Sequence, residues 1–268
     1  MNGAALEARG LSKAFGGVLA IADVSFTVRE GSLTAAIGPN GAGKTTLFNV
    51  LTNLYPADRG AVSCFGTNLT GLAPDAIAAL GLVRTFQTAR VFTGLTVLEN
   101  VLVGGHLRSR TAPWQQALWL DPVRREERAM RERAEALLDV VGLSARRDDP
   151  AAGLPLGAQK LLEIVRALMA SPRVLLLDEP AAGLNDFETA ELARLLLAVR
   201  TAGVTLVVVE HNMSLVMGIA DEVLVLDLGR VIATGSPAAV QAHPRVIEAY
   251  LGRDAGPQEP RGGRPEAT

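Results

Sequence analysis

A single cysteine is present among the 268 residues of this sequence. Cys64 therefore has no internal partner for a disulfide, which indicates a reducing compartment. Because Cys64 follows a strand-like run of small and apolar residues, we interpret it as a core residue rather than a nucleophile.

Long apolar runs and an N-terminal signal are also absent. No uninterrupted apolar stretch approaches the roughly 20 residues that span a bilayer. Residues 1–7 carry neither the basic region nor the apolar core of a signal peptide. We therefore expect a cytoplasmic protein, and a membrane-bound partner is compatible with the sequence.

The charges are nearly balanced, with 26 basic and 28 acidic side chains. This balance gives no support for a general nucleic-acid binder, although it is compatible with a local basic patch. The length suits one large α/β domain or one domain with an inserted subdomain, and a hydrophobic fraction of 49% is enough for a substantial core.

A glycine-rich stretch carries the most specific motif. It fits G-x-x-x-x-G-K-[ST] and has the order Gly38-Pro39-Asn40-Gly41-Ala42-Gly43-Lys44-Thr45-Thr46. An apolar run at 32–37 predicts a buried strand before it, and helical spacing at 47–51 predicts a helix after it. The glycines let backbone N–H groups curl around phosphate oxygens, and the helix N-terminus adds partial positive charge. Lys44 can reach the terminal phosphates and the Thr45 hydroxyl can bind Mg²⁺, so the motif predicts a nucleoside triphosphate site rather than an ordinary glycine-rich turn.

Two further apolar runs end in residues with ionisable side chains. Residues 174–177 lead into Asp178 and Glu179, which predicts a buried parallel strand with carboxylates at the end where open α/β sheets bind ligands. Asp178 can hold Mg²⁺ directly or through water, and Glu179 can orient or deprotonate a water that attacks the γ-phosphate. A solvated acidic turn is the alternative. The second run, at 204–209, ends near His211, which can face the same phosphate.

Several residues keep two interpretations open on the sequence alone. Phe15 precedes two predicted strands, at 18–21 and 24–28, which are expected to be antiparallel because the links are too short for a crossover helix. Its ring can stack on a base or belong to the core. Gln87 ends a predicted strand, where it is either a functional amide or a solvated loop residue. Trp114 and Trp119 lie in a predominantly helical region and either meet another protein or anchor an inserted helix to its own domain.

The order of these elements resembles that of the ATP-binding cassette ATPases, from residue 6 to about residue 252. The resemblance implies an α/β P-loop NTPase core of the RecA-like kind, with an N-terminal antiparallel β subdomain and an inserted helical subdomain at roughly 88–160. Together these parts form one ATPase domain at 1–253. Residues 254–268, rich in proline and glycine, are expected to be a disordered tail.

The resemblance also implies roles for individual residues. Phe15 is expected to stack on adenine, and His211 to hydrogen-bond the γ-phosphate. Gln87 is expected to sense Mg²⁺ and the attacking water while contacting a membrane subunit. Lys44 and His211, with Mg²⁺, would stabilise the phosphate charge while Glu179 acts on the water.

Residues 154–159 occupy the position of the signature motif, which in this family completes the ATP site of a second, facing subunit. They depart from the pattern L-S-G-G-Q, because Pro155 replaces the serine and Ala158 stands where glutamine is usual. Gly157 is retained, and the following helix, predicted at 161–170, still directs its N-terminus at an anion, so we expect a working but altered site between subunits. Asn185 similarly replaces the aspartate usual after the acidic strand, and its spacing to Glu188 is that of a capping box.

Finer resemblance points to the ATPases of branched-chain amino-acid importers, and related urea and short-amide importers share much of it. The segments that carry it are 84–92, the long insertion 104–125, 180–185 and 246–252. The resemblance implies ATP and Mg²⁺ as cofactors, and as partners a homologous ATPase subunit, integral membrane permease subunits and, indirectly, a solute-binding protein. It implies no nucleic-acid partner, and a location on the inner face of the membrane.

Two other functions use the same chemistry. One is an ATPase of an export or lipid-extraction complex, which differs in its membrane partner. The other is a soluble nucleotide-gated switch in repair or translation, although such proteins usually carry two cassettes or a large coiled-coil insertion and this sequence has neither.

Overall fold

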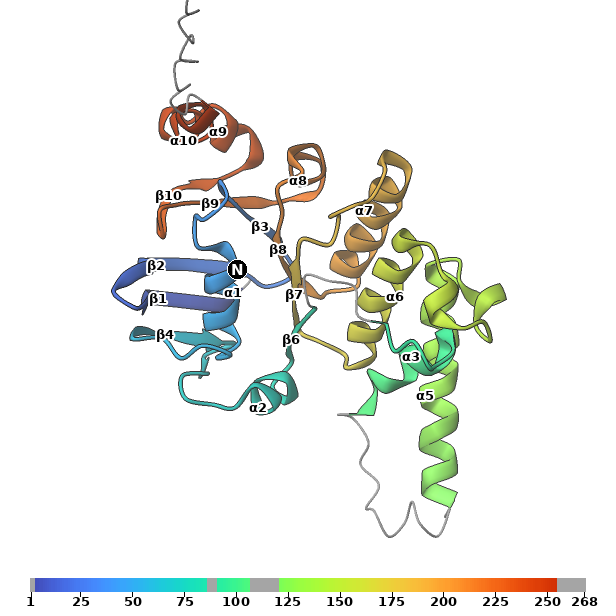
Figure 1. Cartoon of the computed structure of the whole chain (residues 1–268). Coiled ribbons are helices and arrows are strands. Elements are labelled where there is room, and N and C mark those ends of the chain that lie inside the picture. Colours follow the sequence, from blue (N-terminus) through green and yellow to red (C-terminus); the bar gives the residue numbers. More distant parts are fainter. Residues whose placement is uncertain (1–2, 86–90, 107–120, 255–268) are drawn as a thin grey trace, which may run out of the picture.

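The computed structural model describes residues 3–85, 91–106 and 121–254. Within these ranges the chain forms an antiparallel sheet, a mainly parallel sheet and a helical region (Figure 1). The antiparallel sheet and the helical region lie on opposite sides of the parallel strands. The predicted fold class is confirmed.

The antiparallel sheet has the strand order β2-β1-β4-β5. Its strands are β1 (Ala4–Phe15), β2 (Val18–Arg29), β4 (Arg59–Cys64) and β5 (Thr67–Asn68). The two strands expected at 18–21 and 24–28 form the single strand β2, whose register against β1 shifts around Asp23 (φ 54°). The irregularity lets one strand bend without ending.

Cys64 lies at the end of β4 and is buried, which confirms the core interpretation. Burial raises the pKa of its thiol, because the thiolate is disfavoured in an apolar environment. The group is therefore a poor nucleophile.

The second sheet has the order β10-β9-β3-β8-β7-β6. At its centre, β3 (Leu33–Ile37), β8 (Thr205–Val209) and β7 (Val174–Asp178) are parallel and buried along their whole length, as expected for strands covered on both faces. β6 (Leu82–Arg84) and β9 (Glu222–Asp227) extend the parallel set, and β10 (Arg230–Gly235) adds an antiparallel edge. The carboxyl ends of β3, β7 and β8 therefore meet at one edge.

Apolar side chains bury both faces of this sheet. On one face α1 (Lys44–Leu51) contributes Leu47 and Phe48 to a core shared with the antiparallel sheet, and α2 (Pro74–Ala79) contributes Ile77. On the other face α7 (Asp186–Thr201) and α8 (Met213–Ile219) pack with the apolar side of α6 (Leu156–Met169). The parallel strands are fixed between these two cores.

The helical region consists of α3 (Val97–Val103), α5 (Asp121–Val140) and the outer side of α6, packed around a third apolar cluster. Helix α6 begins five residues before the expected position 161, because Pro155 can occupy a helix N-cap, where no intrahelical N–H is required. The boundary expected near residue 160 thus falls inside α6. Trp114 and Trp119 lie outside the described residues.

Helices α9 (Pro237–Gln241) and α10 (Pro244–Asp254) close the C-terminal side. Asp254, which the sequence placed in the tail, is the last residue of α10. The rest of the predicted tail lies outside the described ranges. In the three ranges that the structure covers, no helix is both long and apolar enough to cross a bilayer.

Candidate nucleotide-binding site

The glycine-rich loop joins β3 to α1 at the carboxyl edge of the parallel strands. Gly38 (φ 152°) and Gly43 (φ 99°) both have positive φ. A Cβ at Gly43 would lie 2.5 Å from the Ala20 carbonyl oxygen, and one at Gly38 would collide with the Leu226 carbonyl oxygen. The loop backbone passes directly against β2 and β9, so a side chain is excluded at both positions.

Lys44 is the first residue of α1 and is buried. Its Nζ donates to the carbonyl oxygens of Gly38 at 2.7 Å and Pro39 at 3.1 Å. Burial lowers the pKa of Lys44, and the negative charges of Glu179 and Asp178 partly oppose this effect. The Lys44 ammonium is therefore held inside the loop, within the field of the carboxylates that follow β7.

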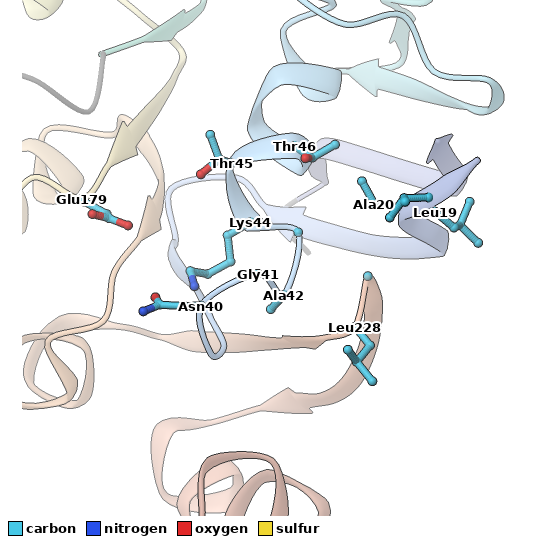
Figure 2. Close-up of a pocket in the computed structure, with 13 residues that line it drawn as sticks. Leu19, Ala20, Asn40, Gly41, Ala42, Lys44, Thr45, Thr46, Glu179 and Leu228 are labelled. Atoms are coloured by element: carbon cyan, nitrogen blue, oxygen red, sulfur yellow. The ribbon is translucent and has the colours of Figure 1, made fainter. Parts of the chain in front are cut away.

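A cavity of about 480 Å³ opens over the loop (Figure 2), a volume suited to a small-molecule ligand. Glu179 faces the loop from one side, whereas the exposed side chains of Leu19 and Leu228 lie at the opposite end. The loop residues that line the cavity are Asn40, Gly41, Ala42, Gly43, Lys44, Thr45 and Thr46. A polar end and an apolar end match the phosphates and the base of a nucleotide.

Phe15 is not among the residues that line this cavity. Its ring meets Tyr55 edge to face, with centroids 5.3 Å apart and planes at 75°, and Lys13 Nζ lies 5.5 Å from the ring centroid. The ring is 42% exposed, so it is neither a core residue nor a wall of the cavity. Stacking on adenine stays a prediction.

Asp178 ends β7 with a side chain that is only 1% exposed. Its Oδ2 accepts a hydrogen bond from Arg84 Nη2 at 2.7 Å, and Arg84 Nη1 donates to Asn49 Oδ1 at 2.6 Å. The other oxygen, Asp178 Oδ1, is buried without a hydrogen-bond partner in the described structure. The ion pair thus fixes the carboxylate and leaves one anionic oxygen open.

The donor set fits Mg²⁺. An unpartnered buried carboxylate oxygen is costly unless a cation or donor meets it, and the hydroxyl of Thr45, a residue that lines the cavity, would supply a second hard oxygen ligand. The described residues contain no group of three or more His, Cys, Asp or Glu side chains that could hold a metal alone. Magnesium ions are commonly held by one or two protein oxygens together with substrate phosphates.

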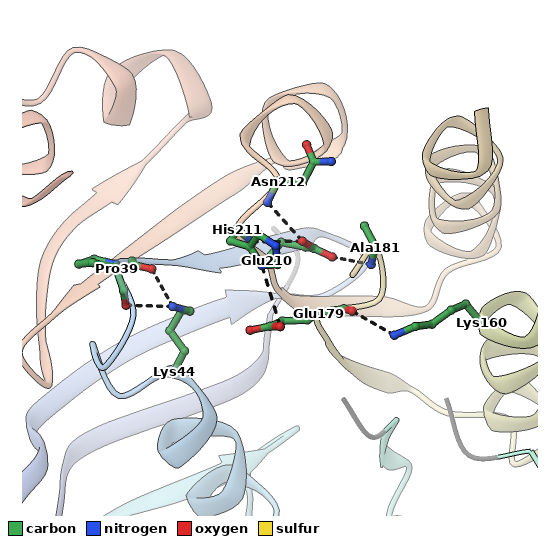
Figure 3. Close-up of polar contacts among 9 residues, drawn as sticks. Pro39, Lys44, Lys160, Glu179, Ala181, Glu210, His211 and Asn212 are labelled. Carbon is green, nitrogen blue, oxygen red and sulfur yellow. Dashed lines mark hydrogen bonds and ion pairs between the residues drawn. The ribbon is translucent and has the colours of Figure 1, made fainter. Parts of the chain in front are cut away.

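Glu179 follows β7 with φ 47°, a conformation uncommon for residues other than glycine. Its N–H donates to the Val209 carbonyl oxygen at 2.9 Å, and its own carbonyl oxygen accepts from Lys160 Nζ at 3.3 Å. Its Oε2 lies 3.9 Å from His211 Nδ1 (Figure 3). The structure thus brings together Glu179 and His211, which are 32 positions apart in the sequence (211 − 179).

Glu210, between β8 and His211, was not singled out in the sequence. It is 1% exposed and accepts hydrogen bonds from the backbone N–H groups of Ala181, His211 and Asn212. The signal was an acidic residue directly after a fully apolar strand, the same signal that identified Asp178.

Three residues expected near a second subunit have well-defined local settings. Gly157 is buried near the start of α6, where a Cβ would come 2.5 Å from Glu188 Oε1, and it does not line the cavity. Asn185 caps α7, and it forms the predicted capping box with Glu188. Pro155 stands at the N-cap of α6 without a side-chain cap. Gln87 lies outside the described residues.

A buried parallel strand, a glycine-rich loop, a helix and an acid at the end of a second buried parallel strand define a P-loop nucleotide-binding protein. The family model of the ABC transporter matches residues 21–182, more than half of the chain, so this chain belongs to the ABC transporter family of ATPases. A second model, that of the branched-chain amino acid ATP-binding cassette transporter, matches residues 230–256.

Curated relatives and solved structures agree with this assignment. The chain is 43% identical over 249 residues to the high-affinity branched-chain amino acid transport ATP-binding protein BraF of Pseudomonas aeruginosa, covering 92% of this chain and 97% of that protein. It is 42% identical over 248 residues to LivG of Salmonella typhimurium, with the same coverage. A solved ATP-binding cassette of an ABC transporter, in an ADP conformation, superposes with a TM-score of 0.81 at 34% identity, covering 93% of this chain and 99% of that one.

Proposed function

We propose that this chain is the ATP-hydrolysing subunit of an importer for branched-chain amino acids or a related small polar solute. The observation that carries the proposal is the meeting of Glu179 and His211, 3.9 Å apart, beside the phosphate loop. The relatives named above, matched over nearly their whole length, support the solute class.

The phosphate loop binds the nucleotide phosphates. Residues 40–46 line the cavity at the N-terminus of α1, whose dipole favours an anion, and Lys44 supplies a buried positive charge. The Lys44 ammonium exchanges its carbonyl partners for phosphate oxygens when ATP enters. The base lies toward the apolar end of the cavity, and Phe15, which does not line the cavity itself, is expected to supply a stacking surface for it.

Thr45, Asp178 and Gln87 would hold Mg²⁺. Bound there, the ion would neutralise phosphate charge and orient the terminal phosphate. The chain's own contribution is a fixed carboxylate, because the Arg84 ion pair prevents Asp178 from rotating out of place.

Glu179 orients the attacking water and accepts its proton, while Lys44 and His211 stabilise negative charge on the transferred phosphoryl group. Phosphoryl transfer depends mainly on positioning and charge, so rigid placement of these three side chains is the main demand on the fold. The positive φ of Glu179 serves this demand, since it turns the side chain toward His211.

A second ATPase subunit completes the site. Gly157 and the N-terminus of α6 form the wall that faces the partner's nucleotide, and Pro155 leaves that wall without the usual hydroxyl. Closure of the pair would move permease helices docked near Gln87. The docked permease keeps the ATPase at the inner face of the membrane. A solute-binding protein delivers solute to the permease on the other side.

The test is purification of the chain with its membrane subunits and binding protein, followed by ATPase and uptake assays in vesicles. We expect leucine, isoleucine or valine to stimulate hydrolysis and to accumulate in an ATP-dependent manner. A complex carrying Glu179→Gln serves as the control, because it assembles and binds ATP without turnover.

Other outcomes would redirect the proposal. Stimulation only by urea or short amides would change the solute, and lipid or solute efflux would identify the export alternative. A chain that hydrolyses ATP but joins no membrane subunit would contradict the transport role and support a soluble switch.

A further inference from the structure

A buried acid that does not line the cavity lies at the end of β8. Glu210 is 1% exposed and is not among the residues that line the cavity. A buried carboxylate is costly unless its oxygens are hydrogen-bonded, so the contacts that stabilise it indicate what it does.

Both oxygens of Glu210 accept from the backbone, and they reach two different loops (Figure 3). Oε1 accepts from Ala181 N–H at 2.7 Å, in the loop that follows Glu179. Oε2 accepts from His211 N–H at 3.1 Å and Asn212 N–H at 3.3 Å, in the loop that follows β8. Hydrogen bonds to a carboxylate are about twice as strong as neutral ones, so this one side chain joins the two loops firmly.

The two loops are the ones that present Glu179 and His211. The Glu179 N–H bonds to Val209 at the end of β8, and the Glu179 carbonyl oxygen accepts from Lys160 Nζ and from Ala182 N–H. The hydrogen bond from Ala181 to Glu210 adds a further tie between the Glu179 loop and the end of β8, through a side chain that also holds the His211 loop. Without it, the separation between the Glu179 and His211 side chains would be less firmly fixed.

We propose that Glu210 is a positioning residue that locks the Glu179 loop and the His211 loop in one arrangement for hydrolysis. This inference rests on the proposed ATPase mechanism, because it assigns Glu210 to the geometry of that same site. Glu210 does not line the cavity, and in this proposal it acts only through Glu179 and His211.

The variant Glu210→Gln tests the lock with almost no change in shape. An amide has one oxygen and one NH₂ group, so it can accept on one side only and must point donors at the N–H groups on the other. One of the two loops therefore always loses its acceptor. We expect kcat to fall about 10- to 100-fold, as for an error of about 1 Å in catalytic geometry, with the KM for ATP nearly unchanged.

Asp221→Asn is the matched control. Asp221 also accepts a backbone hydrogen bond, from Leu33 N–H at 2.8 Å, and an ion-pair hydrogen bond from Arg200 at 2.7 Å. It lies beside the first residue of β3, at the opposite end of the same sheet. We expect this variant to lose stability as Glu210→Gln does, while kcat stays unchanged.

A double variant separates positioning from general damage. If Glu210 acts through the His211 loop, adding Glu210→Gln to His211→Ala will lower kcat by much less than it does in the wild-type background, because interacting residues are not additive. Fully multiplicative losses, or an equal loss of kcat in Asp221→Asn, would overturn the inference.

Glu210→Asp decides the question if the glutamine variant does not fold. Aspartate readily accepts from N–H groups one or two residues ahead, so it keeps the His211 and Asn212 contacts. The aspartate side chain is one methylene shorter than glutamate and loses the hydrogen bond from Ala181 N–H. We therefore expect a reduced kcat with normal nucleotide binding. A full kcat would overturn the proposed positioning role of Glu210. If wild-type chain itself shows no ATPase activity, the proposed function fails, which is distinguishable from a failure of the lock alone.

Discussion

At the carboxyl ends of both β7 and β8, a buried acid is followed directly by a second ionisable residue. Each strand is followed or ended by a buried acid, Asp178 or Glu210, both 1% exposed. In each case the next residue, Glu179 or His211, reaches toward the other across 3.9 Å. The buried acids, however, have different partners.

Asp178 is paired with one side chain, and Glu210 with three backbone N–H groups. The Arg84 pair leaves Asp178 Oδ1 without a partner, so this acid can still take a ligand. Both oxygens of Glu210 are already used. The comparison teaches that burial and position in the sequence do not separate a ligand-binding acid from a positioning acid, whereas the inventory of hydrogen bonds does.

The largest effect is expected from replacing Glu179, which lies 3.9 Å from His211 at these strand ends. Glu179→Gln should lower kcat by about 10²- to 10⁴-fold, because the amide cannot accept the proton from water. ATP binding should persist, and the variant should accumulate as an ATP-bound dimer. Phosphate release and size-exclusion chromatography measure both. Glu99→Gln, in the capping box of α3, is the control and should have normal turnover. Near-normal turnover of Glu179→Gln would refute the assignment.

The next largest effect is expected from breaking the ion pair between Arg84 and Asp178 at the end of β7. Arg84→Met removes the guanidinium and leaves the Asp178 charge buried without compensation, which should lower the free energy of unfolding by about 3 kcal/mol. Denaturant unfolding measures it. Arg9→Met removes an ion pair whose arginine is 75% exposed, and should produce no measurable change. Equal results for the two variants would contradict a special role for the Arg84 pair.

His211, which follows β8, should contribute less to turnover than Glu179. His211→Ala should lower kcat about 100-fold, the usual cost of losing one donor to transition-state charge. Steady-state ATPase kinetics measure this loss. The control is His106→Ala, because His106 is exposed and distant from His211 in the sequence. A loss in His211→Ala that appears only in KM would mean that His211 binds nucleotide without assisting hydrolysis.

The smallest effect concerns the helices that follow the two strand ends. Asn185 caps α7 and Asn212 caps α8, each accepting a backbone N–H with its side chain. Alanine at either position should cost about 1 kcal/mol of stability. Because Asn212 is adjacent to His211, only its replacement should also reduce kcat, and equal turnover in both variants would argue against coupling between the cap and the histidine.

Much of the fold followed from local patterns. The fully apolar runs became the buried parallel strands, the short links became antiparallel pairs, and the asparagine–glutamate spacing became a capping box. Boundaries were less predictable. The apolar spacing predicts α6 from residue 161, whereas the helix begins at Leu156, because proline is tolerated at the N-cap.

The candidate site was predictable where a residue's own neighbours define its chemistry. Lys44, Thr45, Asp178, Glu179 and His211 were identified because each follows a strand or a glycine loop. Phe15 shows the limit, since its place relative to the cavity depends on Tyr55 and on the packing of two strands. The sequence also gave no reason to pair Arg84 with Asp178.

Sequence alone determined that a nucleotide binds between β3 and α1, because the glycine spacing dictates the backbone conformation that phosphates require. Only the tertiary structure decided which buried acids remain open to a ligand. Arg84 and Asp178 are 94 positions apart, and Glu210 and Ala181 are 29 apart. Contacts at such separations follow from the order of strands in the sheet, which brings distant chain segments to one edge and leaves no mark in the local sequence.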